Sequence, residues 1–127
     1  TGEHQYTRYG FRELIKSRSV DIIQPDVMWC GGLTELLRIS AMAAAYDIPV
    51  VPHGSGAYSY HFVVTQPHCP FCEYLNTSPD CKSFPPVFGK MFINEQVPVN
   101  GKIFPSDEPG WGLQLNRKDL NLIRPYQ

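Results

Sequence analysis

The sequence predicts an α/β fold in which a parallel β-sheet is buried on both faces. Short apolar segments, among them residues 20–24 (VDIIQ) and 48–51 (IPVV), alternate with longer amphipathic segments. Strands that are covered on both faces by helices have this near-continuous apolar character. In addition, an ionisable side chain lies at the end of each predicted strand, which is expected where parallel strands end on one rim of a barrel.

The first amphipathic segment is predicted to be a helix that begins near Thr7. Phe11, Leu14 and Ile15 are spaced at i, i+3 and i+4, so they would share one helical face. Thr7 is expected to cap this helix through its hydroxyl group. The strand at 20–24 follows, and Pro25 ends it because proline has no backbone N–H group to donate to a sheet.

The second helix is expected to follow a loop at Gly31 and Gly32, with Thr34 as its cap. It should end near residues 46–47, before the strand at 48–51. Its predicted packing face consists of Leu33, Leu36, Leu37, Ser40, Ala41 and Ala44. A short helical or irregular segment is expected at 58–65, and a last strand at 71–75.

The composition changes after these units. Residues 78–109 are rich in proline, glycine, asparagine and aspartate, with short strand-like pieces at 91–93 and 102–104. Asn100-Gly101 is a signal for a hairpin turn. We therefore divide the chain into 1–77, the carboxyl-terminal βα units of a TIM-like barrel, and 78–127, a loop-rich carboxyl-terminal extension.

Composition and charge exclude several classes of protein. The 127 residues are 43% hydrophobic and 18% charged, as in globular domains. The 11 Lys and Arg residues against 12 Asp and Glu create no field that would attract nucleic acid or an anionic membrane. The longest apolar run, 41–45, is too short to span a bilayer. We expect neither a nucleic-acid nor a membrane partner.

The cysteines and the first residues bear on location and completeness. All 4 cysteines are expected to be reduced thiols of a cytoplasmic protein, since Cys30 lies in an apolar α/β segment. The chain has no initiator methionine, and its first residues resemble the end of a strand. These features predict a fragment, and an open part of a barrel would expose strand edges. The isolated chain is expected to be neither a stable monomer nor a catalyst.

Ionisable residues recur at the ends of the predicted strands. Glu3 with His4, then Asp26, His53 and Glu73 follow one another at intervals of 20 to 27 residues. A (β/α)₈ barrel spreads about 250 residues over eight units, so each interval matches one unit. The carboxyl ends of parallel strands meet on one rim, where such barrels place their active sites. These side chains are therefore predicted to converge.

Two carboxylates and an Asp–His pair suit the removal of a proton next to a substrate carboxylate. That reaction builds a second negative charge, which a divalent metal held by carboxylates can neutralise. Mg²⁺ is the ion best matched to such oxygens. A histidine oriented by an aspartate can accept the proton and return it to a departing hydroxyl. Taken singly, Glu3 and Asp26 could instead be loop carboxylates or helix caps, and His53 a hydrogen-bonded loop histidine.

Several motifs are spread along the chain: Gly2-Glu3-His4, Gln24-Pro25-Asp26, Trp29-Cys30-Gly31-Gly32-Leu33-Thr34-Glu35, Pro52-His53-Gly54, Glu73-Tyr74-Leu75-Asn76 and Phe84-Pro85-Pro86-Val87-Phe88. Together they resemble the mandelate-racemase branch of the enolase superfamily, and the later ones resemble its sugar-acid dehydratases. The resemblance extends over nearly the whole chain.

This resemblance implies the end of a modified (β/α)₇β barrel, with the extension packing on barrel and capping domain. Glu3 matches the last of three acidic Mg²⁺ ligands. His53 matches the base that removes the C2 proton, and Asp26 matches its partner. Glu73 matches the carboxyl group that hydrogen-bonds the substrate carboxylate, which requires a proton on it or shared with the substrate. His4 is a candidate substrate contact, and the whole protein is expected to be a homo-oligomer.

Three alternatives stay open. Cys69 and Cys72 form a C-x-x-C motif, which is typical of thiol-redox proteins when it opens a helix. A zinc site could use His68, Cys69, Cys72 and Cys81, although one C-x-x-C pair is a weak signal. Within the resemblance, a racemase or epimerase would use the same residues together with a second base that this chain does not show.

Overall fold

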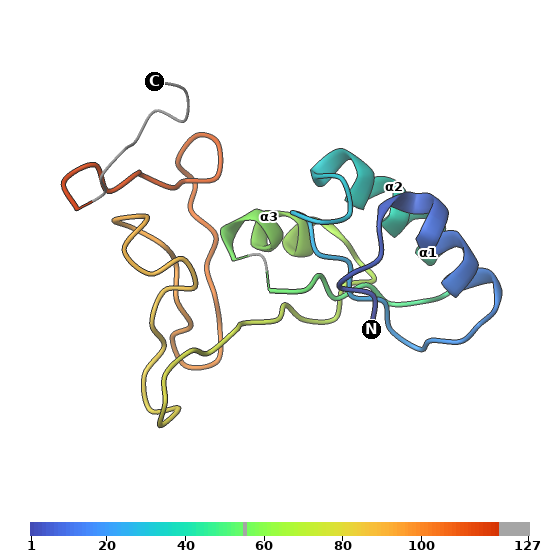
Figure 1. Cartoon of the computed structure of the whole chain (residues 1–127), viewed down its shortest axis with the longest axis horizontal. Helices are drawn as coiled ribbons and strands as arrows, with labels where there is room; N and C mark the ends of the chain where they lie inside the picture. Colours follow the sequence, from blue (N-terminus) through green and yellow to red (C-terminus); the bar gives the residue numbers. More distant parts are fainter. Residues whose placement is uncertain (55, 120–127) are drawn as a thin grey trace, which may run out of the picture. The chain divides into compact units, whose positions relative to one another are not determined.

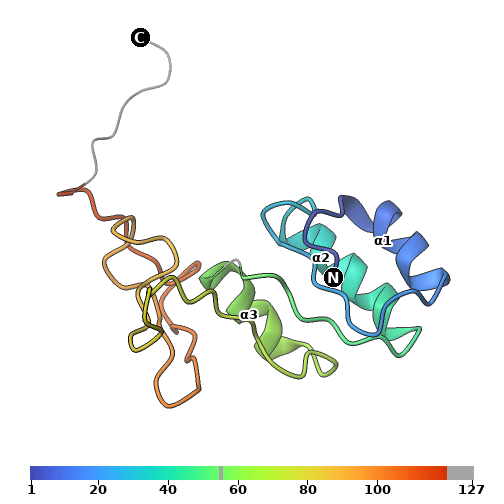
Figure 2. The ribbon, with the colours of Figure 1, turned by 60° about the horizontal axis from the view of Figure 1, so that its bottom comes forward.

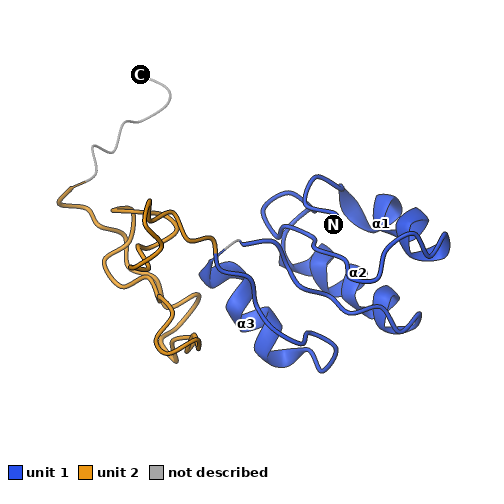
Figure 3. Cartoon of the chain, turned by 90° about the horizontal axis from the view of Figure 1, so that it is seen from below, with its two compact units in different colours: residues 1–74 blue, residues 75–127 orange. Residues whose placement is uncertain are grey.

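The computed structural model describes residues 1–54 and 56–119, which contain three helices: α1 (Thr7–Lys16), α2 (Leu33–Ala44) and α3 (Ala57–Thr65) (Figure 1). The chain divides into two compact units, Thr1–Tyr74 and Leu75–Gln127, and all three helices belong to the first (Figure 3). None of the helices in the described ranges is long and apolar enough to cross a membrane. The division at 77/78 stays a prediction, and its last residues, 120–127, lie outside the described residues.

Helix α1 is where the sequence predicts it, but Thr7 does not cap it. Phe11 and Ile15 are buried, as predicted. Thr7 has a φ of 55° and its side chain makes no capping hydrogen bond. The first amide groups are satisfied by distant partners instead: Thr7 N donates to Cys30 O (3.1 Å) and Arg8 N donates to Glu35 Oε1 (2.8 Å). A tertiary contact has therefore replaced the local cap.

Helix α2 packs beside α1 (Figure 2) and also lacks the predicted cap. Gly32 precedes the helix, no side chain caps it, and Thr34 lies inside its first turn. The buried face is rotated from the predicted one: Leu36, Ile39, Ser40 and Ala43 are buried, whereas Leu37 is 44% exposed. The helix is apolar around much of its surface, so periodicity alone could not determine which side faces the core.

The two predicted strands at 20–24 and 48–51 are extended and parallel but do not form a regular ladder. One parallel bridge joins Ile23 and Val50. Ile23 N donates to Pro49 O (3.1 Å), and Val51 N donates to Ile23 O (2.9 Å). Pro25, Pro49 and Pro52 bring no N–H groups, so the pairing stops after one bridge. Residues 71–75 form neither a strand nor a bridge within the described ranges.

Further main-chain bonds bring the first residues next to the same segment. Gln24 N donates to Thr1 O (2.8 Å), and His53 N donates to Pro25 O (3.0 Å). Gly2 permits this approach, since its φ is +124° and a Cβ there would lie 2.8 Å from the Phe11 ring. The segments that carry Glu3, Asp26 and His53 are thus adjacent. Beneath them lies a core of fully buried side chains, including Phe11, Ile15, Ile23, Leu36, Ile39 and Val50.

The second unit is held by turns and by polar side chains that bond the main chain. Val99 and Lys102 form an antiparallel bridge around Asn100 (φ 51°) and Gly101 (φ 73°), so the predicted hairpin turn is confirmed. Phe92 bridges to Leu115. Glu95 is 9% exposed and accepts hydrogen bonds from the amides of residues 87 and 88. Buried polar anchors of this kind hold loops that lack a large apolar core.

Candidate active site

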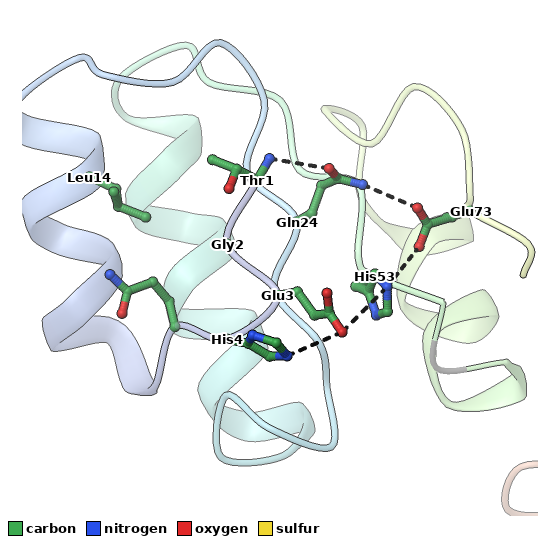
Figure 4. A pocket seen from close by; sticks show the side chains of 9 residues that line it. Thr1, Gly2, Glu3, His4, Leu14, Gln24, His53 and Glu73 are labelled. Carbon is green, nitrogen blue, oxygen red and sulfur yellow. Dashed lines mark hydrogen bonds and ion pairs between the residues drawn. The ribbon is translucent and has the colours of Figure 1, made fainter.

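His53 is the centre of a cluster that the described part of the first unit brings together (Figure 4). Its Nδ1 lies 3.3 Å from Asp26 Oδ2. Its Nε2 lies 3.7 Å from Glu3 Oε1 and 3.7 Å from Glu73 Oε2. These four residues come from four separate segments of the chain, so the fold places them together.

The Asp26 carboxylate is fixed by its own turn. Asp26 is 8% exposed, and its Oδ1 accepts a hydrogen bond from Met28 N at 2.7 Å. Its main-chain oxygen accepts from the amides of Trp29 (3.1 Å) and Cys30 (2.8 Å), which closes the turn that follows the strand segment. Oδ2 is left directed at His53 Nδ1. A proton on Nδ1 facing this carboxylate leaves the lone pair on Nε2, on the side of Glu3 and Glu73.

Glu73 is held at both carboxyl oxygens. Gly54 N donates to its Oε2 at 2.7 Å, and Gln24 Nε2 donates to its Oε1 at 3.4 Å. The Gly54 amide belongs to the residue after His53, so the same short loop supplies the ring and anchors the carboxyl group. Charge-assisted bonds from backbone amides are among the stronger hydrogen bonds in proteins.

His4 lies at the outer edge of the cluster. Its Nε2 is 3.5 Å from Glu3 Oε1, and its side chain is 69% exposed. The Trp29 ring lies against it, with ring centroids 4.8 Å apart. His4 therefore presents an imidazole at the entrance of the cluster, whereas His53 lies inside it.

These side chains border an open cavity of about 430 Å³, lined by Thr1, Gly2, Glu3, His4, Gln5, Leu14, Gln24, His53 and Glu73. A volume of this size is typical of small-molecule sites. Asp26 does not line it, which is consistent with a residue that acts on His53 from behind. The sequence-predicted residues are thus together, while the roles assigned to them remain predictions.

Two groups in the cluster were not predicted. Gln24 is two residues before Asp26, and alternate residues of an extended segment face the same side, so its position could have been inferred. The Gly54 amide has no side-chain signal and could not have been inferred. Both contact Glu73, so each bears on how that carboxyl group is held.

The described residues do not make up a magnesium site by themselves. No group of three or more His, Cys, Asp and Glu side chains in this part of the chain is arranged to hold a metal. Glu3 has the right donor chemistry for Mg²⁺, a partly exposed carboxylate on the cavity wall. A carboxylate is the type of ligand that Mg²⁺ binds, but one carboxylate is too few to hold the ion.

The cysteine alternatives find little support. All 4 thiols are free, and burial raises the pKa of Cys69 to about 11 and also raises the pKa of Cys72. Redox-active thiols need the opposite shift, because the thiolate is the reactive form. No helix follows Cys72 directly. His68 Nε2 lies 3.0 Å from Ser40 Oγ. The His68 ring is therefore hydrogen-bonded to helix α2, although the zinc interpretation would require it as a metal ligand.

The chain belongs to the enolase C-terminal domain-like family, whose model matches residues 1–119. Within that family it is similar to L-rhamnonate dehydratase. It is 51% identical over 126 residues to that enzyme from Saccharopolyspora erythraea, covering 99% of this chain and 32% of the relative.

Solved structures agree with this similarity. L-rhamnonate dehydratase from Gibberella zeae is 61% identical with a TM-score of 0.87, and the match covers 92% of this chain and 30% of that one. The rhamnonate dehydratase from the same organism complexed with Mg is 60% identical with a TM-score of 0.83, covering 92% and 29%. The predicted resemblance to the superfamily is confirmed. The chain spans about a third of the length of these relatives.

Proposed function

We propose that this chain supplies the base and the enolate-stabilising carboxyl group of a Mg²⁺-dependent hydro-lyase that dehydrates L-rhamnonate or a close stereoisomer. The product would be the 2-keto-3-deoxy acid. The observation that carries the proposal is the His53 ring, with Asp26 at Nδ1 and two carboxyl groups near Nε2. Identities of 51% and 61% to enzymes named L-rhamnonate dehydratase favour this substrate class.

In the proposed architecture, residues 1–77 form the last βα units of a (β/α)₇β barrel, and residues 78–127 form an extension on barrel and capping domain. Parallel pairing of Ile23 and Val50 between helices supports the first part. The loop-rich second unit, held by anchors such as Glu95, supports the second. The location is proposed to be cytoplasmic and the whole protein a homo-oligomer.

In the first step of the proposed reaction, His53 Nε2 removes the proton from C2 of the substrate. Asp26 Oδ2 keeps the Nδ1 proton in place and stabilises the imidazolium that forms. The electron pair of the broken C2–H bond moves into the substrate carboxylate, giving an enediolate. Because Asp26 is itself anchored by Met28 N, little reorganisation is needed at this moment.

Glu73 would meet the substrate carboxylate on the other side of His53. In this role it holds a proton, or shares one with the substrate, and hydrogen-bonds the developing enediolate. Its two carboxyl oxygens accept hydrogen bonds from Gly54 N and Gln24 Nε2. Preorganised donors aimed at developing charge are a large source of catalysis.

In the second step the enediolate collapses and the C3–OH bond breaks. The imidazolium of His53 gives its proton to the departing hydroxyl, which leaves as water. The resulting enol takes up a proton at C3 and loses one from its C2 hydroxyl to solvent, which gives the 2-keto-3-deoxy acid. His53 thus acts first as a base and then as an acid, and its starting state is restored.

Bound Mg²⁺, held in part by Glu3, would supply charge neutralisation of the enediolate. The remaining ligands would come from other parts of a whole protein, since Glu3 alone cannot complete the site. His4, next to Glu3, is proposed to contact the sugar hydroxyls from the cavity entrance.

The test is to incubate the whole protein that carries this chain with a panel of sugar acids, with Mg²⁺ or with EDTA. We expect Mg²⁺-dependent formation of a 2-keto-3-deoxy acid from L-rhamnonate or a close stereoisomer. His53→Asn, checked for an unchanged thermal midpoint, should lose this activity. Exchange of the C2 hydrogen or inversion at C2 without dehydration would favour the racemase or epimerase alternative. If neither product nor exchange appears across the panel, the proposal fails.

A further inference from the structure

Gln24 occupies a position in the cluster that none of the roles above requires. It lines the cavity, and its Nε2 donates to Glu73 Oε1 at 3.4 Å. The group that faces it is a carboxyl oxygen, so the NH₂ end of the Gln24 amide, which is the hydrogen-bond donor, is directed at Glu73.

The backbone around Gln24 is held by hydrogen bonds and by buried neighbours. Gln24 N donates to Thr1 O, and the preceding residue, Ile23, is fully buried and paired with Val50. Pro25 follows, also fully buried, with its φ limited by its ring. The Gln24 side chain therefore starts from an immobile point, and its amide reaches Glu73 from a defined direction.

One tripeptide, Gln24-Pro25-Asp26, contacts both His53 and Glu73. Asp26 Oδ2 contacts the His53 ring, Pro25 O accepts from His53 N at 3.0 Å, and Gln24 contacts Glu73. Gln24 and Asp26 are two residues apart and so can face the same side of an extended segment. One rigid tripeptide thus sets the distance between the proposed base and the proposed enediolate-stabilising carboxyl group.

We propose that Gln24 is a positioning residue for Glu73. Its amide and Gly54 N bind the two carboxyl oxygens from different sides and fix the plane of the group beside His53 Nε2. A carboxyl group bonded at Oε2 alone could rotate about that bond, whereas two donors define one orientation. The catalytic consequence rests on the proposed function, but the positioning itself does not.

The experiment compares Gln24→Met with the wild-type whole protein. Methionine keeps the length and apolar contacts of the side chain and removes only its hydrogen-bonding groups. We expect kcat for the sugar acid to fall by about tenfold, while KM changes by less than about threefold, because the oriented carboxyl group matters most when charge develops. Crystal structures should show Glu73 placed as here in the wild type, with Gly54 N 2.7 Å from Oε2, and its carboxyl group rotated about that bond in Gln24→Met.

Gln114→Met is the matched control, since Gln114 lies in the second unit with its side chain exposed. It should leave kcat, KM and the Glu73 position unchanged. Gln24→Glu is the second variant if Gln24→Met fails to fold: it keeps the size and polarity of the side chain but places an acceptor opposite Glu73. It should lower kcat at least as much.

The outcomes separate this inference from the proposed function. An unmoved Glu73 in the Gln24 variants overturns the positioning role, whatever the kinetics. A moved Glu73 with unchanged kcat overturns its catalytic relevance. If the wild-type protein shows no turnover, the proposed function fails, and the crystal structures alone then decide whether Gln24 positions Glu73.

Discussion

The two nitrogens of His53 lie in different surroundings, and this difference determines what the ring can do. Nδ1 faces one buried carboxylate that is itself anchored, whereas Nε2 faces the cavity between two carboxyl groups at equal distances of 3.7 Å. Such a ring has one side fixed for orientation and the other available to a reacting proton. Loss of the Asp26 contact should therefore change the orientation and tautomer of the His53 ring.

Asp26→Asn in the whole protein should lower kcat by about 10²–10⁴-fold, the range that a positioned acid–base group contributes. An amide can donate to Nδ1 and so favours the wrong tautomer, with the proton on Nε2. Asp21→Asn is the control, because Asp21 is exposed and three residues before the strand end at Gln24. Steady-state kinetics with matched thermal midpoints would check this. Equal kcat for both variants would contradict the orienting role of Asp26.

The C-x-x-C motif gives a second prediction at this scale. Because burial raises the pKa of Cys69 to about 11, its alkylation by iodoacetamide at pH 7 should be slow and should increase about tenfold per pH unit up to that pKa. Cys81 is exposed and should react first. Mass spectrometry of peptides after timed labelling separates the two sites. Rapid labelling of Cys69 at pH 7, or a ready disulfide with Cys72, would revive the redox interpretation.

At the scale of elements, the helices could be predicted while their capping groups could not. Phe11 and Ile15 have the spacing of one face, and they are buried in α1. The cap of that helix is Glu35, 27 residues away, which accepts from Arg8 N. A threonine at a helix start is a local signal, and it was wrong at Thr7, whose hydroxyl caps nothing while the amides of Thr7 and Arg8 bond to distant residues. The face of α2 was misjudged for a similar reason, since packing determined it.

Glu35 should therefore stabilise the start of α1 more than its exposed neighbours do. It bonds Arg8 N at 2.8 Å and Arg8 Nη1 at 2.9 Å, and Arg38 also reaches it at 3.4 Å. Glu35→Ala in the whole protein should speed hydrogen exchange of the amides in α1 by about tenfold, as expected for the loss of a helix cap. Glu13→Ala, which removes only a surface pair with Arg12, is the control and should change exchange little.

Lowering the pH should reduce the difference in α1 hydrogen exchange between the wild type and Glu35→Ala. The Arg8 amide holds the pKa of the Glu35 carboxyl below its ordinary value of 4.5, so the fold favours the ionised form. Its contribution is fully present above that value and is lost as the pH falls through the lower pKa of the folded state. The difference between wild type and Glu35→Ala should narrow below pH 4.5. A difference that stays constant with pH would show that the charge plays no part.

The site was more predictable than the strands that present it. Intervals of 20 to 27 residues predicted that Glu3, Asp26, His53 and Glu73 would converge, and the structure places the three carboxyl groups around the His53 ring. The segments themselves pair through one bridge only, because prolines remove the donors that a ladder needs. Gly54 N could not be predicted, since a backbone amide leaves no trace in the residue type.

At the scale of the whole molecule, electric charge would couple the cluster around His53 to a bound Mg²⁺ ion. The chain spans 32% of a curated relative, and its described residues contain no group of three or more His, Cys, Asp and Glu side chains that could hold a metal ion. Three carboxyl groups face the His53 ring within 3.7 Å. A bound cation would offset the charge of those that are ionised as well as that of the substrate, so metal affinity and the arrangement of the cluster should depend on each other.

The isolated 127-residue chain should accordingly neither turn over a sugar acid nor show saturable Mg²⁺ binding below about 1 mM. Titration calorimetry and the keto-acid assay check the two statements separately. In the whole protein, Glu3→Gln should raise the Mg²⁺ concentration for half-maximal activity by at least about tenfold, whereas the exposed Glu108→Gln should not. Turnover by the purified 127-residue chain, free of longer chains, would show that the residues here complete the site without further ligands. Unchanged Mg²⁺ dependence in Glu3→Gln would instead show that Glu3 is not a metal ligand, and its remaining contact would be the one with His53.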